Sequence, residues 1–269
     1  MMIKNLIFGI STTVLREYPV SYALEKIALA GYESAELWPW HLEKWTEPLY
    51  DLRASLEKLV LKLTIHTFTG ELNPLARDAY ESRQAQRRVA ASFQLAADLG
   101  AKMVVIHPGQ RDGESDTAED AWSRLLDWVH ELDDLAGLYG INVGIELMEK
   151  RPFEFLMLPA DAKRLMATGY QNIGLTVDLA HLNTHDNPIN LLEQLHSDWI
   201  SHVHLSDNAP QRVHLPLGTG QMDIGGLLHA LADKYTGLVS IEGSVPEMGL
   251  RLLEQNYSYL EKLGFVHRK

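Results

Sequence analysis

The sequence predicts an α/β protein that folds as a single closed (β/α)8 barrel over residues 1–269. Three observations support this fold class. Short runs of β-branched residues recur along the chain, stretches of helical periodicity separate them, and no low-complexity linker divides the sequence. The length agrees, because α/β barrels of about 250 residues are commonly single domains.

The repeated unit is a helical stretch that ends in glycine and is followed by an apolar run. The phrases are ALAGYESAELW, AADLGAKMVVIHPG, LAGLYGINVGIELM, MATGYQNIGLTVDL and KYTGLVSIEG. A glycine just past a helix end adopts the left-handed conformation without a steric penalty. We therefore expect helix ends at Gly31, Gly100, Gly140, Gly169 and Gly237, and at Gly264 after the last helix.

Eight strands are expected in chain order. Their centres lie near Gly9, Glu36, Ile65, Val105, Ile145, Val177, Val203 and Ile241. Stretches such as AWSRLLDWVHELDDLAGLY supply the helices between them, because their apolar residues recur with a period of about 3.6. An open doubly wound sheet is the alternative, but no GxGxxG turn follows the first strand and a count of eight favours closure.

The composition excludes several classes of function. The chain has no cysteine, which excludes disulfides, a thiolate metal site and a cysteine nucleophile. With 24 Lys+Arg against 36 Asp+Glu, the net charge of -12 argues against nucleic acid as a partner. No apolar run approaches the ~18 residues of a membrane helix, and the opening MMIKNLIFGISTTVL lacks a signal-peptide cleavage site. We expect a cytoplasmic protein without a membrane partner; whether it forms a homo-oligomer stays open.

Ionisable residues end the inward faces of the expected strands. Alternate side chains of a barrel strand face the interior, and the apolar set is expected to face the helices: Leu37, Ile65, Ile106, Ile145, Val177, Val203 and Ile241. The last inward residue of six strands is then His66, His107, Glu146, Asp178, His204 or Glu242. Because unpaired buried carboxylates are costly, this set needs a compensating cation or proton.

One divalent metal ion is the expected cofactor, since it supplies that compensation. Active sites of such barrels lie at the carboxyl ends of the strands, where these residues fall. Three carboxylates and one imidazole suit Mn²⁺, Mg²⁺ or Co²⁺, with Zn²⁺ as an alternative, and they come from Glu146, Asp178, His204 and Glu242. The competing interpretation is a buried hydrogen-bond network without metal.

Five motifs in this order resemble one family over essentially the whole chain. They are VGIELME, LTVDLAHLN, HVHLSDN, HLPLGTGQMD and SIEG. The chain resembles the xylose isomerase-like TIM barrels, which include sugar phosphate isomerases/epimerases, ketose 3-epimerases, inosose dehydratases and endonuclease IV, of the AP endonuclease family 2 type. The resemblance implies that Glu146, Asp178, His204 and Glu242 are the metal ligands and that His181 and Arg212 contact the substrate.

Further residues are expected around a sugar-like substrate. His66 and His107 are expected to contact it, with ligation of a second ion as the alternative. Trp38 either walls the pocket or packs on the barrel rim, and Glu36 binds a substrate hydroxyl or a neighbouring histidine. His214 is expected in the pocket, with the surface as its alternative, whereas His202 is expected to be an interior residue.

The resemblance implies a metal-dependent isomerase or epimerase of a sugar or related polyhydroxy carbonyl compound. It would act by proton abstraction through a metal-stabilised enediolate, with Glu146 and Glu242 as the catalytic acid and base. An inosose-type dehydratase shares the first step. An endonuclease IV-like zinc phosphodiesterase is a further alternative, although Arg212 stands where that subfamily has an aspartate ligand. A non-catalytic sugar-binding barrel would have no use for the ligand set.

Overall fold

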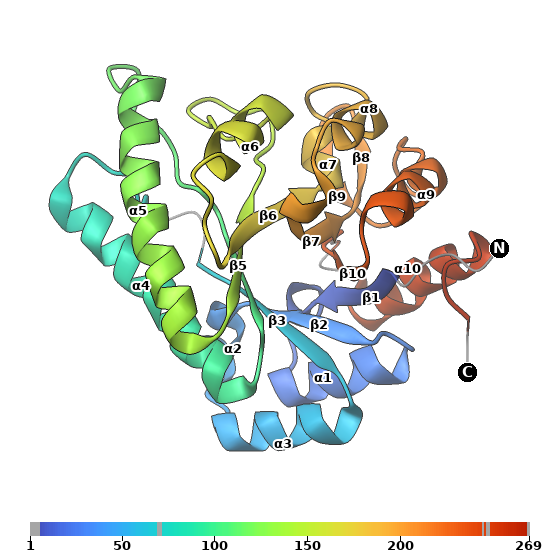
Figure 1. Ribbon diagram of the computed structural model, residues 1–269. Helices are drawn as coiled ribbons and strands as arrows, with labels where there is room; N and C mark the ends of the chain where they lie inside the picture. Colours follow the sequence, from blue (N-terminus) through green and yellow to red (C-terminus); the bar gives the residue numbers. More distant parts are fainter. Residues whose placement is uncertain (1–5, 69–71, 244, 246–247, 268–269) are drawn as a thin grey trace.

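Eight parallel strands close into a barrel in the computed structural model, which describes residues 6–68, 72–243, 245 and 248–267 (Figure 1). The strands are β1 (Leu6–Ser11), β2 (Ser34–Leu37), β3 (Lys62–His66), β4 (Met103–Ile106), β5 (Asn142–Glu146), β6 (Ile173–Asp178), β7 (Ile200–Leu205) and β10 (Gly237–Ile241). Strand β10 closes the barrel by pairing with both β7 and β1. The predicted (β/α)8 fold is confirmed, and each expected strand centre lies within its strand.

Helices cover the outside of the barrel (Figure 1). The α-helices are α1 (Val20–Leu29), α2 (Pro39–Trp45), α3 (Leu49–Leu59), α4 (Ala79–Leu99), α5 (Ala118–Tyr139), α6 (Pro159–Met166), α7 (Leu179–Leu182), α8 (Pro188–Glu193), α9 (Ile224–Lys234) and α10 (Leu250–Lys262). Two short 3₁₀ turns are η1 (Thr12–Leu15) and η2 (Ser197–Trp199). None of the helices in the described ranges is long and apolar enough to cross a membrane.

The carboxyl ends of the strands carry additional short elements. Helix α2 follows β2, α7 follows β6, and an antiparallel hairpin of β8 (Asp207–Ala209) and β9 (Arg212–Leu215) follows β7. These segments surround the rim at which active sites of such barrels lie. They bring residues that are not part of the barrel strands close to the strand ends.

Glycines end the helices as expected, with one exception. Gly31, Gly100, Gly140, Gly169 and Gly264 all have positive φ angles, between 62° and 100°. The prediction for Gly237 is wrong, because this residue begins β10 and α9 already ends at Lys234, with Tyr235 extended. Gly237 is needed for space: a Cβ there would lie 2.5 Å from the hydroxyl oxygen of Tyr235.

The two faces of the strands differ in polarity. The outward residues from Leu37 to Ile241 that the pattern identified are 0–1% exposed and belong to the apolar core. The interior is polar, and Glu36, Thr64, Thr176 and His202 are as deeply buried. Buried polar groups require partners, so this interior must be organised by hydrogen bonds and charges.

Candidate metal centre and the cavity beside it

Four side chains converge where β5, β6, β7 and β10 end. Glu146 and Asp178 are the last residues of β5 and β6, His204 lies in β7, and Glu242 directly follows β10. One ligand atom of each lies within 4.8 Å of those of the others. The Nδ1 atom of His204 is 3.2 Å from Glu146 Oε1 and 3.4 Å from Glu242 Oε2. The structure thus brings together the four residues predicted as ligands; that they bind an ion stays a prediction.

Asp178 is oriented by the helix that follows it. Its Oδ1 atom accepts hydrogen bonds from the backbone N–H groups of Ala180 (2.7 Å) and His181 (2.9 Å), which makes it the N-cap of α7. Its Oδ2 atom is buried and accepts no hydrogen bond. The cap therefore fixes the carboxylate so that one oxygen remains available to the centre.

Carboxylate oxygen atoms with few hydrogen-bond partners gather at this centre. Glu146 Oε2, Asp178 Oδ2 and Glu242 Oε1 are all buried without a well-aligned hydrogen bond, although His107 Nε2 lies 3.0 Å from Glu146 Oε2. Burial raises the pKa of Glu242 well above its ordinary value, and the carboxylates of Glu36 and Glu146 add to this effect. Burial lowers the pKa of His204, but Glu242, Glu36 and Glu146 outweigh it and raise this pKa well above its ordinary value. With raised pKa values, His204 and Glu242 hold protons that offset the negative charge of the neighbouring carboxylates. A bound cation would offset the same charge, so the donor set fits a divalent ion.

His66 and His107 lie on the other side of Glu146. Their Nε2 atoms are 3.5 Å and 3.0 Å from Glu146 Oε2, and the three residues form a second group of donors. His66 Nδ1 donates to the carbonyl oxygen of Thr67 at 2.9 Å, so Nε2 is free to face Glu146. The Trp38 ring stacks on His66 with centroids 3.8 Å apart, which holds this orientation.

His181 and His214 form a third group with Glu149, a residue of the segment after β5 that the sequence reasoning missed. The two Nε2 atoms are 3.2 Å apart, and His181 Nδ1 donates to the carbonyl oxygen of Leu147. Ser206 Oγ lies 3.1 Å from His214 Nδ1. His214 therefore belongs to the site region and not to the open surface.

Arg212 and Glu36 lie outside the four-residue centre. Arg212 begins β9 and lines a hollow of about 660 Å³ together with Glu149, Lys150 and Arg151. Glu36 is fully buried beneath the centre, where His202 and His204 contact its carboxylate. Contact of either residue with a substrate stays a prediction.

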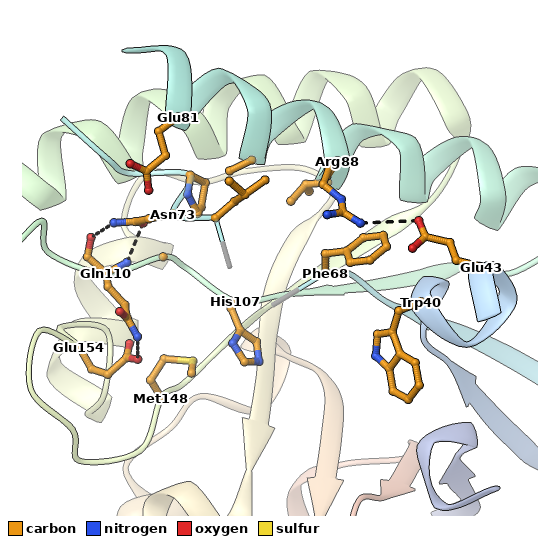
Figure 2. A pocket seen from close by; sticks show the side chains of 15 residues that line it. Trp40, Glu43, Phe68, Asn73, Glu81, Arg88, His107, Gln110, Met148 and Glu154 are labelled. Carbon is orange, nitrogen blue, oxygen red and sulfur yellow. Dashed lines mark hydrogen bonds and ion pairs between the residues drawn. The ribbon is translucent and has the colours of Figure 1, made fainter. Parts of the chain in front are cut away.

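A cavity of about 530 Å³ opens beside His107 (Figure 2). Trp40, Phe68 and Arg88 lie at one end of it, and Gln110 and Glu154 lie at the other. The guanidinium of Arg88 stacks over the Phe68 ring at 3.7 Å. Burial raises the pKa of Glu154 despite a hydrogen bond of 2.6 Å from Gln110.

The sequence reasoning missed four of these cavity residues: Phe68, Arg88, Gln110 and Glu154. Phe68, Gln110 and Glu154 each follow the carboxyl end of a strand, which was the only signal available, and Arg88 comes from the middle of α4. Aromatic faces combined with hydrogen-bonding side chains suit a polyhydroxylated ligand.

Comparison with known proteins agrees with this architecture. Residues 24–265 match the sequence model of a protein family described as xylose isomerase-like TIM barrel. The uncharacterized protein MJ1311 of Methanocaldococcus jannaschii is 25% identical over 264 residues, which cover 94% of this chain and 89% of the relative.

Solved structures share the fold across nearly the whole chain. A D-tagatose 3-epimerase-like protein has a TM-score of 0.82 and 24% identity, covering 96% of this chain and 98% of its own. An L-ribulose 3-epimerase has a TM-score of 0.83 and 18% identity, covering 96% and 94%. The IOLI protein with a binding zinc atom has a TM-score of 0.79 and 21% identity, covering 96% of each chain.

Proposed function

The chain belongs to the xylose isomerase-like TIM barrel family, and we propose that it is a divalent-metal-dependent isomerase or epimerase of a sugar or related polyhydroxy carbonyl compound. One observation carries the proposal. Glu146, Asp178, His204 and Glu242 meet within 4.8 Å at the carboxyl end of the barrel, with three buried carboxylate oxygens that make no hydrogen bond. Two of the structures with this fold are an L-ribulose 3-epimerase and a D-tagatose 3-epimerase-like protein, which supports the same class of reaction.

The same four residues are the proposed ligands of one ion. The donor set suits Mn²⁺, Mg²⁺ or Co²⁺, and the zinc atom of the IOLI protein supports Zn²⁺ as a further candidate. When bound, the cation supplies Lewis-acid stabilisation of negative charge on a substrate oxygen. The carboxylates of Glu146 and Asp178 are deeply buried, which keeps water from competing for them, whereas the Glu242 side chain is 12% exposed.

Proton transfer falls to Glu146 and Glu242. They extend from β5 and β10, which are not neighbours in the barrel, so they approach a bound substrate from different directions. Each has one oxygen without a hydrogen bond, Oε2 of Glu146 and Oε1 of Glu242. One carboxylate removes the proton from the carbon next to the carbonyl group, and the other returns a proton to the opposite face or to the neighbouring carbon.

The surrounding residues orient the substrate. His66, His107, His181 and His214 present imidazole nitrogens around the centre, which suits the hydroxyl and carbonyl oxygens of a sugar. Glu154 and Gln110 offer further polar groups in the adjoining cavity. A dehydratase would use the same arrangement for the first proton transfer and then expel a hydroxyl group.

A metal-dependent phosphodiesterase is the second candidate, because the described residues hold three donor groups side by side. His66, His107 and Glu146 form one outer group, and Glu149, His181 and His214 form the other. Arg212 stands where the endonuclease IV-like subfamily has an aspartate ligand, which argues against several bound ions. Glu149 offers a carboxylate beside His181 and His214 instead, and this weakens that argument. The number of ions per chain separates the two candidates.

The test combines metal content with proton exchange. We expect about one Mn, Mg, Co or Zn per chain by elemental analysis, and deuterium incorporation next to the carbonyl group of ketoses or inososes in D₂O. Glu146→Gln and Glu242→Gln should each slow this exchange by roughly 10²- to 10⁴-fold, because each loses a proton-transfer group. Glu114→Gln, an exposed residue far along the chain from both, is the matched control.

Two results would count against the isomerase proposal. Three zinc ions per chain, together with cleavage of abasic DNA, would favour the phosphodiesterase. Absence of bound metal after incubation with excess divalent ions would leave neither candidate tenable.

A further inference from the structure

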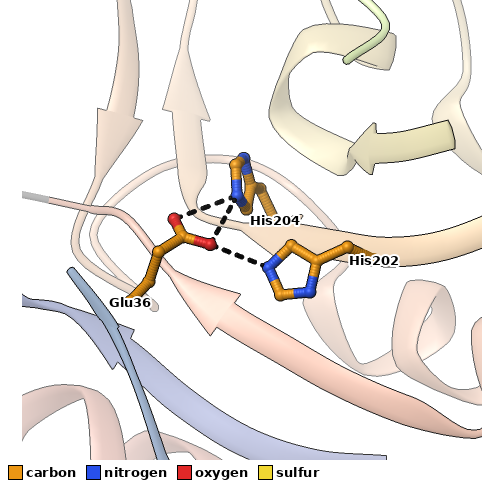
Figure 3. A group of neighbouring side chains, drawn as sticks. All are labelled: Glu36, His202 and His204. Carbon is orange, nitrogen blue, oxygen red and sulfur yellow. Dashed lines mark hydrogen bonds and ion pairs between the residues drawn. The ribbon is translucent and has the colours of Figure 1, made fainter. Parts of the chain in front are cut away.

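A buried group of polar side chains, Glu36, His202 and His204, adjoins the candidate metal centre through His204 (Figure 3). Both histidine rings of the His202–Val203–His204 segment face the carboxylate of Glu36. His202 Nε2 lies 2.9 Å from Glu36 Oε2, and His204 Nε2 lies 3.1 Å from Oε1 and 3.3 Å from Oε2. These three residues are 0% exposed, so water does not provide alternative partners.

The chemistry of Glu36 determines which nitrogen of His204 carries a proton. An ionised carboxylate only accepts hydrogen bonds, so His204 Nε2 must be the N–H donor. In the neutral ring, Nδ1 then has the lone pair, and this atom faces Glu146 Oε1 and Glu242 Oε2. A lone pair directed at two carboxylates is unfavourable unless a cation lies between them, which is the arrangement of a metal ligand.

Glu36 is itself held in place by further donors. The Thr64 hydroxyl donates to Glu36 Oε2 at 3.0 Å, and Thr64 is the register partner of Glu36 across β2 and β3. His202 donates to the same oxygen from the far side of the barrel interior. The carboxylate is therefore fixed by contacts from two other strands, β3 and β7, and is not available to a substrate in the cavity.

We propose that Glu36 is a positioning residue that keeps His204 protonated at Nε2 and so presents Nδ1 to the cation, with His202 and Thr64 holding Glu36 in place. The role as a ligand-orienting group depends on the proposed metal-dependent function, whereas the protonation of His204 Nε2 does not. This assignment replaces substrate contact as the role of Glu36.

Glu36→Gln tests the proposal, because the amide keeps the shape but turns one accepting oxygen into a donor. Whichever oxygen position the NH2 group takes, it presents a donor to a histidine Nε2 atom, to that of His204 at the Oε1 position (3.1 Å) or to that of His202 at the Oε2 position (2.9 Å), so that ring must change its protonated nitrogen. We expect the affinity for Zn²⁺, measured by competition with a chelator, to fall by roughly 10- to 100-fold. Thr176→Val is the matched control: it removes a hydroxyl that is buried in the same interior and makes no hydrogen bond, and its affinity should stay within about threefold of wild type.

A spectroscopic readout separates orientation from general damage to the core. Long-range ¹H–¹⁵N correlation spectra of histidine-labelled protein report which ring nitrogen is protonated, and His204→Asn assigns the signals. We expect His204 Nε2 to be protonated in the wild type with and without Zn²⁺, and this state to be lost or mixed in Glu36→Gln.

These experiments distinguish failure of the role assigned to Glu36 from failure of the proposed metal-dependent function. A wild-type His204 without a proton on Nε2 overturns the proposal even if no variant folds. Unchanged Zn²⁺ affinity in Glu36→Gln overturns it as well. A wild type that binds no metal but has Nε2 of His204 protonated contradicts the metal-dependent function and supports the assignment of the proton.

Discussion

Asp178 serves the fold and the site with different oxygen atoms. Oδ1 caps α7 through the N–H groups of Ala180 and His181, while Oδ2 faces the centre without a hydrogen bond. A cap contributes to stability, whereas a buried carboxylate beside Glu146 and Glu242 opposes it when no cation is bound. The two contributions can be separated by substitution because an amide can retain the cap and remove the charge.

We predict that Asp178→Asn abolishes tight metal binding without destabilising the metal-free protein. The amide oxygen still accepts from Ala180 and His181, and the loss of charge relieves repulsion. Asp178→Ala loses the cap too and should be less stable than Asp178→Asn by roughly 0.5–2 kcal/mol. Urea unfolding in the presence of a chelator measures both; equal stabilities of the two variants would show that Oδ1 has no capping role.

Residues at strand ends could be predicted from sequence, and residues in loops could not. The position of Glu146 or His204 follows from the alternation of side chains along a strand and from barrel closure. Glu149, Glu154 and Arg88 reach the site through segments whose course depends on tertiary contacts. Arg212 lines a hollow together with Glu149, and its contact with a substrate stays a prediction.

Asp116 connects the beginning of α5 to the loops beside it through hydrogen bonds and an ion pair. This carboxylate, 1% exposed, accepts from the backbone N–H of Asp112 at 2.7 Å and pairs with Arg124 of α5. Arg124 Nε also donates to the carbonyl oxygen of Leu75 at 2.8 Å. The contacts therefore join the segment before α4, the segment after β4 and α5, beside the cavity of Figure 2.

Asp116→Asn should destabilise the protein by roughly 1.5–3 kcal/mol at pH 7, because it weakens hydrogen bonds to a charged group. Burial raises the pKa of Asp116, but the Asp112 N–H and Arg124 outweigh it and the net pKa is lowered. A lowered folded pKa means that the contribution is complete above the unfolded value of about 3.9 and is lost as the pH falls below it.

Unfolding free energies measured between pH 7 and pH 3 check this prediction. The difference between wild type and Asp116→Asn should shrink on the acid side. Glu114→Gln, an exposed neighbour with the same change of charge, should stay within about 0.5 kcal/mol of wild type. A difference that is independent of pH would show that the charge of Asp116 does not contribute.

At the scale of elements, all eight barrel strands were predictable because each contains an apolar run, and a correctly predicted helix end precedes β2, β4, β5 and β6. The β8–β9 hairpin was not, since its strands of three and four residues are too short for a periodic pattern. The segment after the hairpin is held by Asp207, whose carboxylate accepts from the backbone N–H groups of Gly218, Gly220 and Met222. These hydrogen bonds join residues that are 11–15 positions apart in the sequence, so no short motif indicates them.

The buried carboxylates of the candidate centre lie together at one end of the barrel. Metal binding there should therefore raise the stability of the whole protein. Binding to the folded state alone stabilises a protein by roughly 2.7 kcal/mol at 100 times the dissociation constant. For a chain of this size we expect a rise in Tm of roughly 5–10 °C. The interior carboxylates Glu146, Asp178 and Glu242 supply the repulsion that the ion removes.

Thermal unfolding with and without Mn²⁺, Co²⁺ or Zn²⁺ measures this effect. Glu146→Gln should raise the Tm of the metal-free protein or leave it unchanged, and should reduce the shift on adding metal. A full shift in Glu146→Gln would mean that the ions bind at another place.

Because Asp178 both caps α7 and faces the candidate metal centre, its position also limits how the sequence can diverge. A lineage that abandons the chemistry can lose Glu146, whose Oε2 serves no backbone group, with little consequence for folding. The same lineage needs a side chain at position 178 that still caps α7, such as Asn, Ser or Thr. Position 178 should therefore stay polar in descendants long after the site has ceased to function, as a trace of the ancestral centre.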